Sequence, residues 1–273
     1  MDDQDFRQLL NRFHLSWEGY RKVRKGVKKR LHRHMQRTGC RNFRQYLQAI
    51  DENSEIEHQC KLLLTVSISR FFRDRRLWEV LETDILPGIF GENREEVRVW
   101  SAGCALGQEV YTFKVLWQKV GPARGQGPPL RLWATDMNPD YLRRAQAGVY
   151  SRSSLKEVPQ VFVNTSFEPL HGKRSFAIDD GLKEDVIWET RDLLSPPPAT
   201  GFQLVFLRNN LLTYYKAECK VPAFADIAAS ITKGGHLIIG SHERIPSGFE
   251  GHFTRRHLSG ILQKTTSPSG GIR

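Results

Sequence analysis

Cysteine is scarce in this sequence of 273 residues, and its four cysteines lie far apart. No C-x-x-C pair is present, so we expect neither a disulfide framework nor a zinc ribbon. No apolar run approaches the roughly 18 residues that a membrane-spanning helix needs. The first residues, MDDQDF, are acidic, whereas a secretory signal peptide begins with basic residues and continues with apolar ones. We therefore expect a cytoplasmic protein with reduced thiols and no membrane insertion.

Acidic residues are outnumbered: 30 aspartates and glutamates face 41 lysines and arginines, which gives a formal net charge of +11. Residues 21–37 (RKVRKGVKKRLHRHMQR) hold nine of the basic residues and no acidic one. Their apolar residues recur at every fourth position, which predicts a cationic helix with one narrow apolar stripe. The stripe consists of Val23, Val27, Leu31 and Met35. Such a charge surplus indicates an anionic partner, either nucleic acid or an acidic protein surface.

Hydrophobic spacing divides the chain into two predicted domains. Helical spacing dominates residues 1–75, which predicts a small all-helical domain. In residues 76–273, short apolar runs alternate with helical patterns, which predicts an α/β domain with a parallel sheet covered on both faces. The predicted strands are 97–102, 130–135, 186–190, 203–207 and 236–241, and the predicted helices are 109–120, 140–147 and 216–232.

One stretch interrupts this alternation. Residues 155–185 contain the short runs Val161–Val163 and Ser175–Ile178 among prolines and glycines, which predicts a small β-rich insertion. The tail, residues 265–273, has the composition of a disordered segment.

The first predicted strand, 97–102, runs into a loop with Gly103 and Gly107, which allow tight turns and close approach to a ligand. The spacing does not match the dinucleotide fingerprint G-x-G-x-x-G, and Glu109 would repel a pyrophosphate but attract a cation. Asp136 ends the second strand, where an acid commonly accepts hydrogen bonds from ribose hydroxyls. A nucleoside with a cationic tail describes S-adenosylmethionine. A glycine turn and an acid that caps the next helix would give the same pattern.

Further motifs run through nearly the whole chain, roughly residues 5–265. They are FRQYL after the basic helix, SISRFFRD (67–74), WSAGCALGQEVYT (100–112), ATDMNPDYLRRAQAGVY (134–150), RDLLS (191–195), FLRNNLLTYY (206–215) and GGHLIIGSHE (234–243). In this order they resemble the CheR-type chemotaxis receptor methyltransferases, which transfer a methyl group from S-adenosylmethionine to receptor glutamates. The resemblance implies a Rossmann-like S-adenosylmethionine-dependent methyltransferase domain with a β-rich insertion, preceded by a small helical domain.

The resemblance also implies a set of cofactor-binding residues for S-adenosylmethionine and its product S-adenosylhomocysteine. They are Ser67, Ser69, Arg73, Glu109, Asp136, Asp192, Leu193, Arg208 and Asn209. Ser67 and Ser69 replace the family's Asn and Thr and keep a hydroxyl. Asp192 replaces an Asn, which adds a negative charge near the expected adenine site.

The candidate catalytic residues are Arg73 and Tyr214. The guanidinium of Arg73 is a fixed fork suited to a carboxylate of the cofactor or the substrate. The family's phenol aligns with Thr213, but Tyr214 and Tyr215 follow, so a shift by one residue could supply it. The sequence leaves open which residue stands at that place and whether Thr213 impairs activity.

The resemblance gives the basic helix a partner, the acidic methylation region of a chemoreceptor's cytoplasmic helical bundle. Arg30 and Arg33 fall on the matching docking positions, and Arg37 lies one turn further on. We favour this partner over nucleic acid. No metal site is expected, because His32 and His34 are two residues apart and cannot share a helix face.

Methyl transfer to a glutamate needs no base, because a free glutamate with a pKa of about 4.3 is already ionised at neutral pH. Three functions are compatible with the sequence. The favoured one is protein-glutamate O-methyl transfer to chemoreceptors. The alternatives are methyl transfer to another protein or RNA, and a degenerate module that binds S-adenosylmethionine without turnover.

Overall fold

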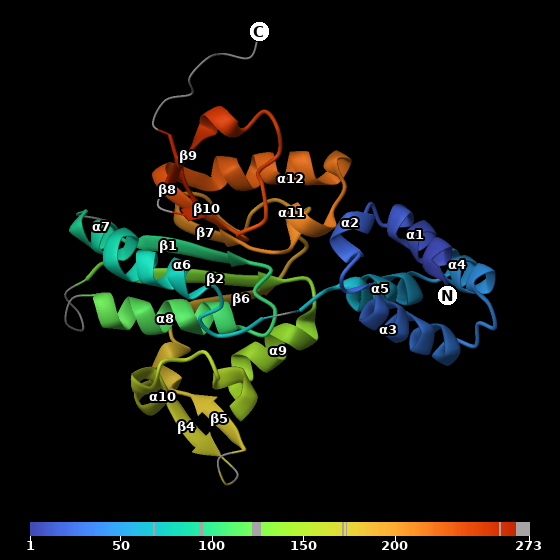
Figure 1. Cartoon of the computed structure of the whole chain (residues 1–273), viewed down its shortest axis with the longest axis horizontal. Helices are drawn as coiled ribbons and strands as arrows, with labels where there is room; N and C mark the ends of the chain where they lie inside the picture. Colours follow the sequence, from blue (N-terminus) through green and yellow to red (C-terminus); the bar gives the residue numbers. More distant parts are fainter. Residues whose placement is uncertain are drawn as a thin grey trace.

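Figure 1 shows a computed structural model of the chain, with a helical part beside an α/β part. The structure describes residues 1–67, 69–92, 95–121, 127–170, 172, 174–256 and 258–265. Of the tail predicted to be disordered, 265–273, all but the first residue lies outside the described residues.

The amino-terminal part is built from helices around a hydrophobic core of its own. The helices are α1 (Asp3–Arg12), α2 (Trp17–Tyr20), α3 (Arg24–Arg37), α4 (Phe43–Glu52) and α5 (Ser54–Leu64). The predicted stripe of the basic helix lies in this core, because Val27, Leu31 and Met35 are buried there. The helix ends shortly before Gly39, whose φ of +74° is a conformation that favours glycine.

A continuous helical segment leads from this part to the sheet. It consists of α6 (Arg75–Val80), the π-helical turn η1 (Leu81–Ile85) and α7 (Leu86–Gly91). Trp78 of α6 stacks on Phe206 of the sheet, with 5.6 Å between the ring centroids. The segment therefore belongs to the layer that covers one face of the sheet.

The central sheet has seven strands in the order β6-β2-β1-β7-β8-β10-β9. They are β1 (Val97–Ala102), β2 (Leu130–Asp136), β6 (Val186–Thr190), β7 (Phe202–Leu207), β8 (Ile231–Ile239), β9 (Phe253–Arg256) and β10 (Leu258–Lys264). The first five in the spatial order are parallel, and β10 and β9 add an antiparallel edge. The predicted α/β class and all five predicted strands are confirmed, whereas the hairpin of β9 and β10 was not foreseen.

Helices cover both faces of this sheet, as predicted. Figure 1 shows α12 (Ala217–Ser230) on one side and α8 (Gln108–Val120) on the other. Two shorter helices of this part follow strands of the sheet: α9 (Pro139–Ala147) comes after β2, and the single turn α11 (Leu211–Tyr214) comes after β7. In the sheet, β1 lies between β2 and β7: the next strand along the chain, β2, pairs with one edge of β1, and the later strand β7 pairs with the other edge. This reversal of strand order beside β1 is where open α/β sheets bind ligands, at the carboxyl ends of the strands.

The insertion between β2 and β6 carries a small antiparallel sheet in the order β3-β5-β4. Its elements are β3 (Val149–Ser151), η2 (Arg152–Leu155), α10 (Gln160–Ser166), β4 (Phe167–Leu170), β5 (Ser175–Ile178) and η4 (Asp180–Leu182). The run Val161–Val163, which the sequence predicts to be part of a β-rich segment, lies in the helix α10. In this helix Phe162 is buried and stacks on Phe72, with 5.5 Å between the ring centroids, whereas Val161 is exposed. The run therefore does not bury both faces, as an inner strand would.

The two parts of the chain meet where α2 packs on α11. Leu15 and Tyr215 form an isolated antiparallel bridge, and the amide of Ser16 donates to the carbonyl of Tyr214 at 2.7 Å. A Cβ atom on Gly19 would lie 2.3 Å from the carbonyl oxygen of Thr213. Only glycine lets the two elements approach this closely.

Gly19→Ala should therefore destabilise the protein by about 1–3 kcal/mol, because the added methyl group forces α2 away from α11. Gly26→Ala in α3 is the matched control, since nothing lies within 4 Å of its added methyl group. Alanine there should stabilise the helix by roughly 0.5–1 kcal/mol. Urea denaturation compares the two variants. A Gly19→Ala protein as stable as wild type would show that the junction relaxes without cost.

Candidate functional site

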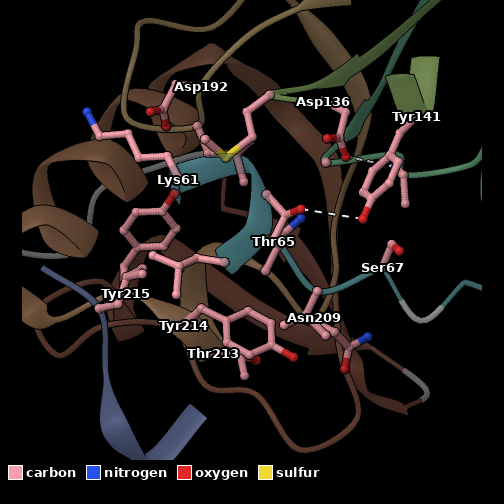
Figure 2. A pocket seen from close by; sticks show the side chains of 18 of the residues that line it. Lys61, Thr65, Ser67, Asp136, Tyr141, Asp192, Asn209, Thr213, Tyr214 and Tyr215 are labelled. Carbon is pink, nitrogen blue, oxygen red and sulfur yellow. Dashed lines mark hydrogen bonds between the residues drawn. The ribbon is translucent and has the colours of Figure 1, made fainter. Parts of the chain in front are cut away.

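A cavity of about 500 Å³ lies between the helical part and the carboxyl edge of the sheet. Figure 2 shows side chains from both parts pointing into it. The structure places all the predicted cofactor-binding and catalytic residues in its wall: Ser67, Ser69, Arg73, Glu109, Asp136, Asp192, Leu193, Arg208, Asn209 and Tyr214. Among the described lining residues, none of the three predicted docking arginines appears. The three predicted docking arginines therefore lie outside the lining of the cavity.

The glycine loop forms the floor of the cavity beside β1. The amides of Gly103 and Cys104 both donate to the carbonyl of Thr135, at 2.8 and 2.9 Å, which ties the loop to β2. Gly103 has a φ of +76°, and a Cβ on it would lie 2.5 Å from Nδ2 of Asn210. The loop thus requires glycine both for its conformation and for its contact with the segment after β7.

Asp136 shapes this loop and also faces the cavity. Its Oδ2 accepts from the amide of Ala105 and its Oδ1 from the amide of Asn138, each at 2.9 Å. Asp136 is 8% exposed, and burial raises the pKa of its carboxyl while the two amide hydrogen bonds oppose the shift. Each carboxylate oxygen keeps acceptor capacity for a further donor, such as a ribose hydroxyl.

Glu109 is held by two donors from neighbouring strands. Its Oε1 accepts from the hydroxyl of Ser101 at 2.8 Å, and its Oε2 accepts from the guanidinium of Arg208 at 3.1 Å. The side chain of Arg208 is 5% exposed; it also pairs with Asp74 and donates to the carbonyl of Arg73 at 3.4 Å. This ion-pair network fixes Glu109 and the segment around Arg73 against the end of β7.

Arg30 has a different environment from the other two predicted docking residues. Arg33 and Arg37 are exposed, but Arg30 is half-buried. Its guanidinium donates to the carbonyl of Leu63 at 3.2 and 3.0 Å and to the carbonyl of Thr65 at 2.8 Å. It therefore caps the end of α5, where the chain turns towards Ser67. The docking role of Arg30 stays a prediction, and its observed contacts are internal.

The three residues considered for the family's phenol have distinct contacts. Thr213 donates its hydroxyl to Oε1 of Glu243 at 2.5 Å. Tyr215 lies against both the helical core and the core beneath α12. Tyr214 packs on Tyr20 with 4.9 Å between ring centroids, and its hydroxyl lies on the side of Asn209 in Figure 2. Burial raises the pKa of Tyr214, the charge of Arg73 opposes the shift, and the charge of Glu243 adds to it.

Several lining residues were not foreseen from the sequence. Lys61 reaches the cavity from α5 and Tyr141 from α9, where Thr65 donates to the Tyr141 hydroxyl at 3.5 Å. Asn210 caps α11 through Oδ1 and donates to the carbonyl of Ala102 through Nδ2. Only Asn210 left a signal, as the second asparagine of the R-N-N motif. Lys61 and Tyr141 are placed by the meeting of distant helices, which hydrophobic spacing does not predict.

Residues 67–260 match the family described as CheR methyltransferase, SAM binding domain. The chain belongs to the CheR methyltransferase family. This confirms the resemblance read from the motifs, and the matched domain includes the glycine loop, Asp136 and the R-N-N segment.

Chemotaxis protein methyltransferases of two Listeria species are similar to this CheR chain. The protein of Listeria monocytogenes serovar 1/2a is 30% identical over 203 residues, 74% of this chain and 75% of that protein. The protein of Listeria innocua serovar 6a is 32% identical over 183 residues, 67% of each chain. A probable chemotaxis protein methyltransferase of Rhizobium etli is 29% identical over 226 residues, 80% of this chain and 84% of that protein. These relatives support S-adenosylmethionine-dependent methylation.

Two further features of this CheR chain concern its described residues alone. No described helix is long and apolar enough to span a membrane. No group of three or more His, Cys, Asp or Glu side chains that could hold a metal ion occurs in the part of the chain that the structure describes.

The contacts of Arg30 predict that Arg30→Met weakens S-adenosylmethionine binding several-fold, because the segment of Ser67, Ser69 and Arg73 loses its anchor at the end of α5. Loss of the charged hydrogen bonds should also lower the free energy of unfolding by about 1.5–3 kcal/mol. Calorimetric titration and urea denaturation measure the two effects. Arg33→Met, one turn away and exposed, is the control and should change neither. Equal cofactor affinity in both variants would contradict the anchoring role.

Proposed function

We propose that this CheR methyltransferase transfers a methyl group from S-adenosylmethionine to glutamate carboxylates on the cytoplasmic helices of chemoreceptors, forming methyl esters. The observation that carries this proposal is the shared cavity. One wall comes from the S-adenosylmethionine-binding domain, and the other comes from the helical part with its cationic helix. Such an arrangement suits an acidic helical substrate that docks on α3 and presents a side chain to the cavity.

The lining residues fit S-adenosylmethionine. Glu109 and Asp136 are among the carboxylates that line the cavity, and carboxylates suit a ligand that carries a positive charge and hydroxyl donors. We assign the cationic methionine part to the side of Glu109, the ribose to Asp136, and the adenine to the side of Asp192 and Leu193. The bound cofactor would supply the methyl group as an electrophile.

The chemistry left to the chain is positioning. A glutamate substrate is already an anion at neutral pH, so no base has to activate it. Arg73 can hold a carboxylate through its fork of donors, and Tyr214 can donate one hydrogen bond to the reacting groups. Closing the substrate between the two parts would remove water from the carboxylate, which the fixed donors then replace.

The docking face is the outer side of α3. Lys25, Lys29, Arg33 and Arg37 are exposed and recur at every fourth position, so they share one face of the helix. The opposite side of α3 lies in the helical core. A row of cations of this length matches acidic residues spaced along a partner helix. Nucleic acid would also be attracted, and it is the competitor that the experiment must include.

Transfer of tritiated methyl groups to a purified chemoreceptor cytoplasmic fragment tests the proposal. Wild-type protein should label the fragment, and mild base should release the label as volatile methanol because methyl esters hydrolyse readily. A fragment with its acceptor glutamates changed to alanine is the control and should stay unlabelled. Base-stable label would indicate another methylated group, and labelling of RNA in place of the fragment would favour the alternative substrate class. Binding of S-adenosylmethionine without any transfer would indicate a non-catalytic module.

Tyr214→Phe should slow single-turnover methyl transfer about tenfold and leave S-adenosylmethionine affinity nearly unchanged. A hydrogen bond to the reacting groups, worth about 0.5–1.5 kcal/mol, affects the transition state more than ground-state binding. Tyr215→Phe is the matched control, and thermal melts of both variants report stability. An unchanged rate with a lowered melting temperature would reject a catalytic Tyr214 and leave it as a packing residue.

A further inference from the structure

A carboxylate behind the cavity wall gathers hydrogen bonds from three places in the chain. Glu243 follows the end of β8, and it is not among the described residues that line the cavity. Its Oε2 accepts from the amides of Asn209 and Gly240, at 2.8 and 2.7 Å. Its Oε1 accepts from the hydroxyl of Thr213 at 2.5 Å. The side chain thus joins the exits of β7 and β8 to the single-turn helix α11.

One of these partners is held in an uncommon backbone conformation. Asn209 has a φ of +55°, in the left-handed region that non-glycine residues adopt at a cost of about 1 kcal/mol or more. Its amide donates to Glu243 from that conformation. A Cβ on Gly240 would lie 2.7 Å from Oδ1 of Asn209 and 2.8 Å from Oε2 of Glu243. Gly240 thus leaves the room that lets the carboxylate and Asn209 meet.

Thr213, another partner of Glu243, belongs to α11, a helix too short to fix its own orientation. α11 is one turn long, begins at the cap of Asn210 and ends at Tyr214. The bond from Thr213 to Glu243 fixes one side of this turn, and packing on α2 fixes another. Burial raises the pKa of the Tyr214 phenol, the charge of Arg73 opposes this shift, and the negative charge of Glu243 adds to it.

We propose that Glu243 is a positioning residue for methyl transfer. Its carboxylate sets the backbone of Asn209 and the orientation of α11, and through α11 it aims Tyr214 at the cavity. The hydroxyl of Thr213 is part of this anchor, so Thr213 serves to hold the turn. The inference rests on the proposed methyl transfer for its activity readout alone.

Glu243→Ala and Glu243→Gln test it together. In Glu243→Gln the amide oxygen can accept from both backbone amides, and the amide nitrogen can donate to the hydroxyl of Thr213. We expect Glu243→Ala to lower the single-turnover rate about tenfold or more, with S-adenosylmethionine affinity within about threefold of wild type. Glu243→Gln should restore the rate to within about threefold of wild type. Glu250→Ala is the control, because this exposed glutamate accepts from a single loop amide, that of Gly248.

Hydrogen exchange gives a readout that does not depend on turnover. The amides of Asn209 and Gly240 should lose protection in Glu243→Ala and keep it in Glu243→Gln. If Glu243→Ala does not fold, Thr213→Val removes one bond of the anchor, and its rate should fall about threefold at unchanged cofactor affinity. Wild-type rates in every variant, or equal losses of rate and cofactor affinity, would overturn the inference. A wild-type protein that labels no receptor fragment would refute the proposed function, and amide protection would then decide the role of Glu243.

Discussion

The buried guanidinium of Arg208 is the interaction on which the site depends. It joins Glu109 at the start of α8, Asp74 at the start of α6 and the carbonyl of Arg73, three points that are distant in sequence. The side chain of Arg208 is 5% exposed, so the loss of Glu109 would leave a desolvated positive charge without its more buried partner. The network therefore sets where the segment from the helical part crosses the sheet, and so where Arg73 faces the glycine loop.

The junction of the two parts determines what the cavity can enclose. Residues 14–16 pair with residues 214–216, so the strand exit that carries Tyr214 is held by the helical part as well as by the sheet. A substrate helix on α3 would bear on the same part that closes the cavity. The helical part that carries α3 therefore also holds the segment of Tyr214 beside the cavity.

The sequence predicts the elements that bury continuous apolar runs and misses those that do not. The parallel strands β1, β2, β7 and β8 each contain a run of buried apolar residues, whereas β9 (Phe253–Arg256) is a short, mostly exposed strand at the sheet edge. The sequence predicts the cofactor-binding residues of the cavity because recognisable motifs stand at the carboxyl ends of the strands. Arg30 and Glu243 show the limit of this approach. Spacing places Arg30 on the basic helix, but only the fold brings it to the carbonyl of Leu63, and nothing in the motif GGHLIIGSHE reveals that Glu243 reaches Thr213.

The charge of the basic helix is also divided by the fold. Arg24 and Lys28 pair with Asp3 of α1, and Arg30 is held by backbone carbonyls, so these cations stabilise the helical part itself. The exposed cations lie on the outer face, where screening limits their reach to about 8 Å at physiological ionic strength. An acidic partner must therefore approach within contact distance of that one face to gain from it. In the sequence, the positive charges are spread along the whole basic helix. In the structure, its exposed cations lie on the outer face of α3, because the opposite face packs in the helical core.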